Sequence, residues 1–255
     1  MRRVEHLLRA TARAEVRHFW FRGFRAFVTP LLRQATAGLT DARLLDCGCG
    51  TGANLELLGT FGLAFGFDLT ETGLRIGRAT GRTRLARATV SAVPFPAASF
   101  HIVTSFDVLY SLPDSDEEAS IAEMYRVLVP GGYAIVNVAA MEVLRGDHSV
   151  LSHELRRYSR EELRGKMTRA GFRVERLTYT NASLFLPLAV ARLIQRRRGL
   201  RQESEADAEI SVPPQPINAL MIAVMRLEAL WLRHFDAPFG SSLLCLARKP
   251  AAAAP

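Results

Sequence analysis

The stretch that points most directly to chemistry is residues 44–55, with the sequence LLDCGCGTGANL. A short apolar run ends at Asp46, and three glycines at alternate positions follow before a helical pattern begins near residue 53. Glycines between a strand and a helix let the backbone turn sharply and let a ligand lie against the amides of the helix start. In sheets that bind nucleosides this way, an acid about 20 residues downstream binds the ribose hydroxyls. Asp68 stands 20 residues after Gly48, so the pattern predicts a nucleoside site on an α/β sheet.

The spacing DxGxGxG at 46–52 resembles motif I of the class I S-adenosylmethionine-dependent methyltransferases. Three later stretches, 93–109, 125–136 and 156–172, resemble the same family in order and spacing, so the similarity spans roughly residues 15–250. The chain is similar to the methyltransferase type 11-like branch, bacterial enzymes that act on small molecules. Nicotinamide-binding folds more often read GxGxxG, and the three later stretches argue against that alternative.

The resemblance implies an α/β protein with the Rossmann-like class I methyltransferase fold. Its seven-stranded, mostly parallel sheet has the order 3-2-1-4-5-7-6, with an N-terminal helical cap and a helical insertion before the last strand. The resemblance also implies S-adenosyl-L-methionine as the cofactor. We expect a single methyltransferase domain over 1–255. Its parts are a cap at 1–40, a cofactor-binding core at 41–180, a helical insertion that caps the site or binds substrate at 181–240, the last strand at 241–249 and a disordered tail at 250–255.

Apolar periodicity and turn residues predict the elements of that fold. Helices are expected within 3–37 and at 52–59, 70–80, 114–128, 160–170 and 217–235, and strands at 43–47, 62–68, 85–90, 101–110, 133–140, 172–180 and 241–249. Pro30 is expected to open or interrupt the second N-terminal helical segment, because proline has no N–H. Thr70 is expected to cap one helix, and Ser159 with Glu162 forms a capping box before another.

The same resemblance assigns roles at the cofactor. Asp46 is expected to orient the glycine loop and the cofactor's amino group, and Asp68 to take the ribose diol. Related sequences carry an acid at the adenine where this chain has Thr89. A threonine contributes no charge, so we expect adenine to be held by the backbone around Val90 and by apolar packing. The full set of expected cofactor contacts is Asp46, Gly48, Cys49, Gly50, Gly52, Asp68, Leu69, Thr89, Val90 and Ser105.

The catalytic residues are harder to read, because methyl transfer mainly requires alignment and the cofactor supplies the reactive carbon. The family often has an acid–histidine pair after the fourth strand, where this chain has Tyr110 and Ser111. Residues 141–159 form a long connection at the ligand edge of the sheet, and histidine is a base near neutral pH. The expected catalytic residues are His148, His153 and Tyr110. Hydrogen bonding within the loop explains the two histidines equally well.

Four residues are expected to contact the substrate. His18 and Trp20 lie in the aromatic segment RHFWFRGF, whose counterparts in similar sequences indicate a lid over the cleft. The alternative is that these aromatic side chains pin the N-terminal helix to the sheet. Arg157 and Tyr158 belong to the long connection. An arginine there either binds a phosphate or carboxylate bidentately or caps the next helix, and both interpretations stay open.

The composition is ordinary for a globular protein, but the net charge is +8 and the pI is near 10.1. Only Lys166 and Lys249 are lysines, so the excess is arginine. We interpret the charge as a solvated surface and do not favour a nucleic-acid partner, because no RNA-binding module accompanies it. The apolar residues 184–201 contain an arginine cluster near their end, which suits a peripheral contact with an anionic membrane. Packing within a monomer or across a homodimer interface is the interpretation that we favour for them.

Three cysteines without clustered partners predict neither a disulfide framework nor a metal site. We expect small buried thiols in a reducing compartment. The first 20 residues lack the apolar core of a signal peptide, and no run reaches the ~18 apolar residues of a membrane span. The expected location is therefore cytoplasmic.

The expected activity is methyl transfer from S-adenosyl-L-methionine to a small-molecule or lipid- or sugar-carrier-linked metabolite, with oxygen favoured over nitrogen or carbon as the acceptor. The alternative is a methyltransferase-like protein that binds the cofactor or a partner without turnover, because Thr89, Tyr110 and Ser111 depart from the family pattern. RNA methylation ranks below both, since residues 107–110 lack the (N/D)PPY motif.

Overall fold

The computed structural model describes residues 11–146, 149, 153–198 and 212–251, apart from the side chain of Arg196. The start of the predicted N-terminal helix, His148 and most of the expected disordered tail at 250–255 lie outside the described residues.

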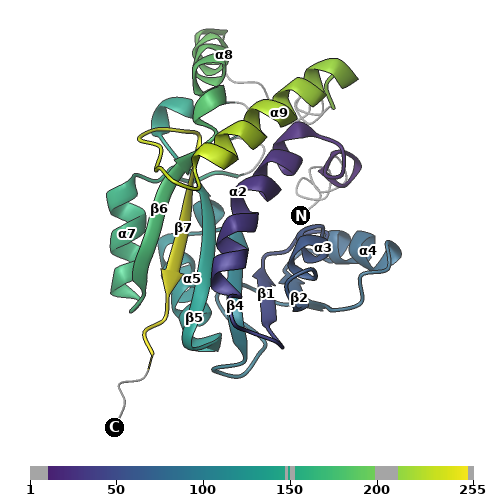
Figure 1. Cartoon of the computed structure of the whole chain (residues 1–255), viewed down its shortest axis with the longest axis vertical. Coiled ribbons are helices and arrows are strands. Elements are labelled where there is room, and N and C mark those ends of the chain that lie inside the picture. Colours follow the sequence, from purple (N-terminus) through teal and green to yellow (C-terminus); the bar gives the residue numbers. More distant parts are fainter. Residues whose placement is uncertain (1–10, 147–148, 150–152, 199–211, 252–255) are drawn as a thin grey trace.

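One sheet of seven strands runs through the part of the chain that the structure describes, in the order β3-β2-β1-β4-β5-β7-β6 (Figure 1). Neighbouring strands from β3 to β5 are parallel, and β7 is antiparallel to both β5 and β6. The strands are β1 (Arg43–Cys47), β2 (Leu63–Asp68), β3 (Leu85–Arg87), β4 (Phe100–Phe106), β5 (Leu128–Ala139), β6 (Arg173–Thr180) and β7 (Ser242–Arg248). The predicted fold class and strand order are confirmed.

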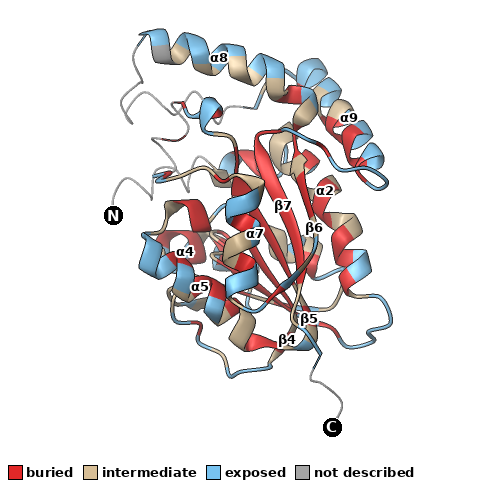
Figure 2. Ribbon diagram, turned by 90° about the vertical axis from the view of Figure 1, so that its left-hand side faces the viewer, coloured by how far each residue is buried: buried red, intermediate tan, exposed pale blue. Residues whose placement is uncertain are grey.

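Helices cover both faces of this sheet (Figure 2). The helices are α2 (Phe19–Ala35), α3 (Asn54–Leu58), α4 (Glu71–Ala79), α5 (Asp114–Val127), α7 (Arg160–Arg169), α8 (Phe185–Arg198) and α9 (Gln215–Trp231), with 3-10 turns η1 (Leu109–Ser111), η2 (Glu142–Leu144) and η3 (Ala182–Leu184). On one face, α5 and α7 bury Met124 and Met167 in an apolar cluster with Val103 and Cys245 of the sheet. The predicted capping box opens α7.

On the other face, α2 runs unbroken through Pro30, so the expectation that this proline opens or interrupts a segment is wrong. A proline inside a helix costs about 3 kcal/mol through a lost hydrogen bond and a clash with the preceding turn. The same helix buries Phe27, Val28, Leu31 and Leu32 against the sheet. Each such side chain contributes roughly 1.5–3 kcal/mol when it is buried, so packing outweighs the local penalty.

Strand β4 is shorter than its apolar pattern predicts: it ends at Phe106, whereas the pattern continues to residue 110. Asp107 has a φ of +61°, which turns the chain out of the sheet, and η1 follows directly. The turn leaves Asp107 at the carboxyl end of a parallel strand, the edge where ligands of open α/β sheets bind.

Between β6 and β7 the chain forms η3, α8 and α9, within the range predicted as a helical insertion. α9 packs beside α2, where a Cβ at Gly23 would come within 2.3 Å of the Met225 side chain. Asn218 of α9 accepts a hydrogen bond from the amide of Phe19 and donates one to the carbonyl of Arg17, both at 2.8 Å. Among the described residues, no helix is both long and apolar enough to cross a membrane.

Candidate functional site

The glycine loop lies at the carboxyl end of β1, directly before α3 (Figure 1). Gly48, Gly50 and Gly52 have φ values of +76°, +57° and +76°, a region that residues with a Cβ rarely adopt. The amides of Gly48 and Cys49 both donate to the carbonyl of Phe67 in β2, at 2.9 Å each. Glycine therefore permits the turn, and the backbone of β2 holds it in place.

Asp68 ends β2 and binds the same loop. Its Oδ2 accepts a hydrogen bond from the amide of Gly50 at 2.8 Å. Its Oδ1 accepts one from the amide of Thr70 at 2.8 Å and another from the Thr70 hydroxyl. Thr70 precedes α4 as predicted, but its hydroxyl serves Asp68 and caps no helix amide. Asp68 is half-buried, at the edge where the ribose is expected.

Asp46 lies beneath this loop and is 1% exposed. Its Oδ1 accepts a hydrogen bond from the Thr104 hydroxyl at 2.7 Å, and its Oδ2 has no partner among the described residues. Burial raises the pKa of Asp46 to about 7. The hydrogen bond from Thr104 lowers this pKa, and the negative charge of Asp68 raises it further. The loop amides bond to Phe67 and Asp68 instead of Asp46, so Asp46 does not orient the loop through a direct hydrogen bond. Its unused oxygen is a buried acceptor that calls for a donor.

The loop also touches the end of β4. A Cβ at Gly48 would lie 2.5 Å from Cγ2 of Val108, so both its positive φ and this close contact require glycine. β1 and β4 are the neighbours at which the strand order reverses, which is where ligands bind in such sheets. Asp107, one residue before Val108, is therefore placed beside the loop.

Asp107 is an acid that the sequence analysis did not assign to the site. The Asn137 side-chain amide donates to its Oδ1 at 2.9 Å, and its own amide donates to the Asn137 carbonyl at 2.9 Å. The residue reaches solvent, yet protein surrounds its carboxylate closely. This desolvation is the main cause that raises the pKa of Asp107 to about 6. The hydrogen bond from Asn137 and the charge of Arg157 lower the pKa, and the charge of Glu154 raises it. In the sequence, Asp107 is an acid within an apolar pattern that predicts a strand to residue 110, so nothing there marked it as a strand-end residue.

The residues expected around adenine line the next part of this edge. Leu69 is exposed just past the end of β2, and Val90 is half-buried against the apolar core. The Thr89 hydroxyl lies 3.0 Å from the hydroxyl of Ser91 and accepts from the Ser91 amide at 3.4 Å. Thr89 is thus engaged within its own turn, and its contact with adenine stays a prediction.

Cys49 and Ser105 are buried, at 8% and 1% exposure. The Cys49 side chain faces β2, where a Cβ at Gly66 would lie 2.8 Å from its sulfur, and burial raises the pKa of its thiol. Cys49 therefore serves the loop through its backbone. Cys47 and Cys245 are also free and buried, as the sequence predicts.

The segment before α2 reaches the glycine loop through Glu15, which sequence reasoning missed. The Thr51 hydroxyl donates to the Glu15 carboxylate at 2.8 Å. Glu15 is buried, and this burial raises its pKa despite the bond from Thr51. No spacing rule links these two residues, since they are 36 positions apart.

The sequence left two roles open for His18 and Trp20, a lid over the cleft or packing of the N-terminal helix, and the two residues differ in their surroundings. His18 is buried, caps α2 by accepting from the Trp20 amide at 3.2 Å, and stacks on Phe19. This arrangement gives His18 a structural role. Trp20 is half-buried one turn before Phe24, whose ring packs edge-on against Phe106 at the end of β4. Residues four apart share a helix face, so Trp20 extends toward the carboxyl edge of the sheet, and its lid role stays a prediction.

Two of the three expected catalytic residues can be placed. His153 is exposed with a φ of +50°. Tyr110 is buried in the core cluster, and its carbonyl accepts from the amide of Leu155 at 2.9 Å. Their catalytic roles stay predictions, as does that of His148.

Arg157 and Tyr158, both expected at the substrate, hold the loop together instead. Arg157 forms a two-pronged ion pair with Glu154, with Nε to Oε1 at 2.5 Å, and donates to the carbonyl of Ala140 at 3.0 Å. Its side chain is only 7% exposed, so direct substrate binding by Arg157 finds no support here. Tyr158 is 2% exposed and donates its hydroxyl to the buried Glu117 at 2.8 Å, which places it in the core.

Residues 45–136 match the family model described as Methyltransferase domain. This segment is a class I methyltransferase domain. It runs from β1 into β5 and contains the glycine loop, both flanking acids and Asp107. Over these residues, the family resemblance inferred from the sequence is confirmed.

Curated methyltransferases are similar to part of this chain. The demethylmenaquinone methyltransferase of Geobacillus kaustophilus is 32% identical over 114 residues, covering 41% of this chain and 48% of that protein. The ubiquinone/menaquinone biosynthesis C-methyltransferase UbiE of a Marinomonas species is 29% identical over 128 residues, covering 46% and 48%. The chain thus spans about half the length of the curated relatives that it matches.

Solved structures share the fold over more of the chain. One chain of the Haloferax volcanii complex that contains the Trm112 methyltransferase activator superposes with a TM-score of 0.60 and 20% identity, over 99% of both chains. Phosphoethanolamine N-methyltransferase 2 of Haemonchus contortus, in complex with S-adenosyl-L-methionine, gives 0.55 and 18%, over 87% of this chain and 51% of that one. The cyclase SpnF gives 0.57 and 21%, over 89% and 81%. Because the named reactions differ, this likeness shows the methyltransferase fold alone.

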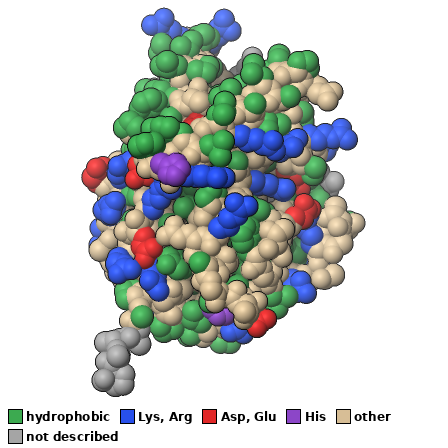
Figure 3. Space-filling model, in the orientation of Figure 1, with side chains coloured by type: hydrophobic (Ala, Val, Ile, Leu, Met, Phe, Trp, Pro, Cys, Tyr) green, Lys and Arg blue, Asp and Glu red, His purple; other side chains and the backbone are tan. Residues whose placement is uncertain are grey.

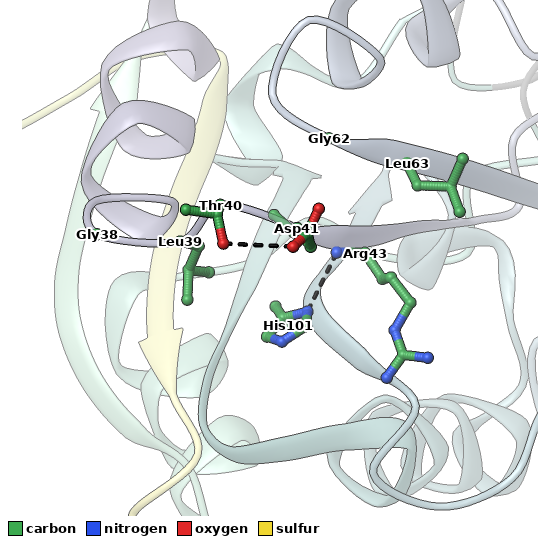
Figure 4. Close-up of a pocket in the computed structure, with 9 residues that line it drawn as sticks. Gly38, Leu39, Thr40, Asp41, Arg43, Gly62, Leu63 and His101 are labelled. Carbon is green, nitrogen blue, oxygen red and sulfur yellow. Dashed lines mark hydrogen bonds between the residues drawn. The ribbon is translucent and has the colours of Figure 1, made fainter.

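A hollow of about 670 Å³ lies at the opposite edge of the methyltransferase domain (Figure 4). It is lined by residues 38–43, 62–63 and His101, at the amino ends of the strands. There the amide of Arg43 donates to Nδ1 of His101 at 3.1 Å. The hollow does not adjoin the glycine loop, so we do not assign it to the domain's cofactor site.

Proposed function

We propose that this chain transfers a methyl group from S-adenosyl-L-methionine to a small hydroxylated substrate. One arrangement carries the proposal: the glycine loop is bonded to Asp68 on one side and touches the end of β4, beside Asp107, on the other. The first contact belongs to a nucleoside site, and the second puts an acid next to it. The matched methyltransferase domain supports the same assignment.

The residues at the carboxyl edge fit this cofactor. Asp46 offers a buried carboxylate oxygen without a partner among the described residues, which suits the amino group of the methionine part. Asp68 keeps lone pairs for the ribose hydroxyls, because each carboxylate oxygen accepts more than one hydrogen bond. Leu69 presents an exposed apolar side chain to a flat base. The cofactor supplies an electrophilic methyl carbon when it is bound.

Asp107 is the base in this proposal. A carboxylate with a pKa of about 6 is mostly ionised at neutral pH and still accepts a proton readily. Removal of the proton from a phenol or enol leaves negative charge shared between the oxygen and the neighbouring carbon, and the proton passes to the Asp107 carboxylate. Asn137 holds Oδ1 during this step. His148 and His153 are the other candidates for the same task.

The acceptor in this proposal is a ring carbon of a hydroxylated aromatic compound. The relatives are named for demethylmenaquinone methylation and for C-methylation in ubiquinone/menaquinone biosynthesis, and they give no support to the oxygen preference stated from the sequence. Methylation at carbon is favoured when the neighbouring hydroxyl has lost its proton, which is the chemistry that Asp107 offers. The methylated ring carbon then releases its own hydrogen as a proton and the ring oxygen regains one, so that the hydroxylated ring is restored. A small-molecule acceptor also accords with the names of these relatives, which point to quinone-type compounds.

The test measures cofactor binding and turnover separately. Calorimetric titration with S-adenosyl-L-methionine is expected to show equal binding by the wild type and by Asp107→Asn. With 1,4-dihydroxynaphthalenes as acceptors, the wild type should release S-adenosylhomocysteine, and Asp107→Asn should lose about 100-fold or more in kcat. Cofactor binding without turnover of any hydroxylated ring would favour the non-catalytic alternative. Equal turnover by the two proteins would remove Asp107 as the base.

A further inference from the structure

Helices α8 and α9 both lie at one end of the molecule, beyond the carboxyl edge of the sheet (Figures 1 and 2). Exposed apolar side chains on α8 are Leu186, Val190, Leu193 and Ile194. Their spacing of i, i+4, i+7 and i+8 places them on one helix face. Leu186 is 72% exposed, so this face of α8 has no covering element among the described residues.

α9 is apolar on two faces. One face buries Ile222, Met225 and Ala229 in the core cluster shared with α2. The other exposes Ile217, Leu220, Leu227 and Trp231, which recur at the spacings of one helical stripe. Leu220 and Leu227 are 64% and 66% exposed. An exposed apolar face of this kind contributes nothing to the folded chain itself and is typical of a surface that contacts an external partner.

Arginines border these stripes. Arg22 of α2 and Arg226 of α9 line an apolar hollow of about 460 Å³ together with Leu227 and Leu230. The sole acid in α8 or α9, as far as the structure describes them, is Glu228, whose carboxylate accepts from the amides of residues 182 and 183 at 2.8 and 3.0 Å. Figure 3 shows hydrophobic side chains over this end, with basic side chains at the tip of α8 and along the border of α9.

We propose that α8 and α9 seat the protein on the surface of an anionic lipid bilayer. The exposed stripes enter the boundary of the acyl chains, and the arginines meet lipid phosphates. Trp231 and Phe235 stack at 5.3 Å, and both are about half exposed at the end of the α9 stripe. Aromatic side chains of this kind favour the membrane–water interface. The contact is interfacial, since no described helix is able to span the membrane.

A second copy of this chain suits the surface less well than a bilayer. Pairing two α9 stripes would bring Arg22 and Arg226 of each copy toward the same residues of the other. Like charges repel, and the described parts of α8 and α9 expose no acid that would offset them. An anionic surface complements all of these arginines at once. The inference rests on α8, α9 and the neighbouring Arg22 of α2, and on no residue of the proposed methyl-transfer site, so it stands apart from the proposed methyl transfer.

The test is co-sedimentation of the full chain with vesicles of phosphatidylglycerol and phosphatidylcholine, against vesicles of phosphatidylcholine alone. The wild type is expected to bind the anionic vesicles preferentially. The variant Leu220→Ser/Leu227→Ser should lose at least about fivefold in bound fraction, because two exposed leucines no longer enter the lipid. The variant Arg22→Gln/Arg226→Gln should lose most of the preference for anionic lipid.

The matched control is Leu39→Ser/Leu63→Ser, which changes two exposed leucines at the opposite edge of the sheet and should bind like the wild type. Calorimetric cofactor binding by every variant reports that it is folded. Equal binding by the α9 variant and the wild type, or no vesicle binding at all, would overturn the proposal. A dimer seen by analytical ultracentrifugation, lost in the α9 variant and indifferent to vesicles, would assign the stripe to a second copy.

Discussion

The side-chain carboxylate of Asp68 accepts a hydrogen bond from the backbone amide of Gly50 at 2.8 Å. This bond joins the end of β2 to the turn that follows β1, its neighbour in the sheet. The same carboxylate also accepts from Thr70 at the start of α4. One acid therefore holds the loop in place and, in the proposed site, binds the ribose as well.

Asp68→Ala is expected to weaken S-adenosyl-L-methionine binding by about 100-fold or more. Each hydrogen bond to a charged group contributes roughly 1.5–3 kcal/mol, and 1.4 kcal/mol is about a factor of ten in affinity. Calorimetric titration measures the change. Thr70→Val is the matched control, because it removes one hydroxyl from Asp68 but leaves the Gly50 bond, and it should lose less than about tenfold. Unchanged affinity in Asp68→Ala would contradict the assignment.

Gly48→Ala should destabilise the protein by two separable effects. A residue with a Cβ at φ +76° is strained by about 1–2 kcal/mol, and the new Cβ would meet Val108 at 2.5 Å. Overpacking of this kind costs roughly 1–3 kcal/mol more. Urea unfolding measures the total as a loss in the free energy of unfolding.

Gly38→Ala is the matched control for that substitution. Gly38 has nearly the same φ, +78°, but a Cβ added there would meet nothing within 4 Å, so only the strain should remain. The double variant Gly48→Ala/Val108→Ala should recover part of the lost stability, because the clashing methyl groups are gone. Equal losses at Gly38 and Gly48 would show that the contact between the glycine loop and β4 is unimportant.

The features that could be predicted from the sequence are those set by residues close together in the chain. The capping box at Ser159 and Glu162 is a three-residue motif, and the strand order followed from a family whose glycine loop and Asp68 are read directly. Asp107 was missed because the apolar pattern of 101–110 continues past it, and only its positive φ ends the strand. A left-handed backbone at a residue other than glycine leaves no mark in composition.

Tyr158 was misplaced for a different reason. Its sequence context is a long polar loop at the ligand edge, which normally indicates contact with a substrate. The loop folds back on α5, however, so that Tyr158 and Arg156 both bind the buried Glu117. Tyr158 and Glu117 are 41 residues apart, and no spacing rule predicts a pair over that distance.

Asp46→Asn is expected to change how stability depends on pH. The pKa of Asp46 rises from an ordinary 3.8 to about 7 in the folded state, so the folded protein binds its proton more tightly than the unfolded chain does. The stability from Asp46 is therefore fully present below about pH 4 and is lost as the pH rises through about 7. The variant should gain stability relative to the wild type across this window, by up to about 4 kcal/mol. Urea unfolding at about pH 5 and about pH 7.5 measures this gain, and a constant difference would argue against a buried, half-bonded carboxyl.

The ion pair between Glu154 and Arg157 should tune the proposed base. Glu154 raises the pKa of Asp107 and Arg157 lowers it. Glu154→Gln removes the negative charge that raises the pKa of Asp107, so the acid limb of the kcat profile should move to lower pH by about half a unit or more. Arg157→Gln removes the positive charge that lowers this pKa, so the limb should move to higher pH. Steady-state rates from about pH 5 to about pH 8 measure the acid limb in both variants. A pair that only supports the loop would lower kcat in both variants without moving the limb, and shifts in the same direction would rule out this electrostatic coupling.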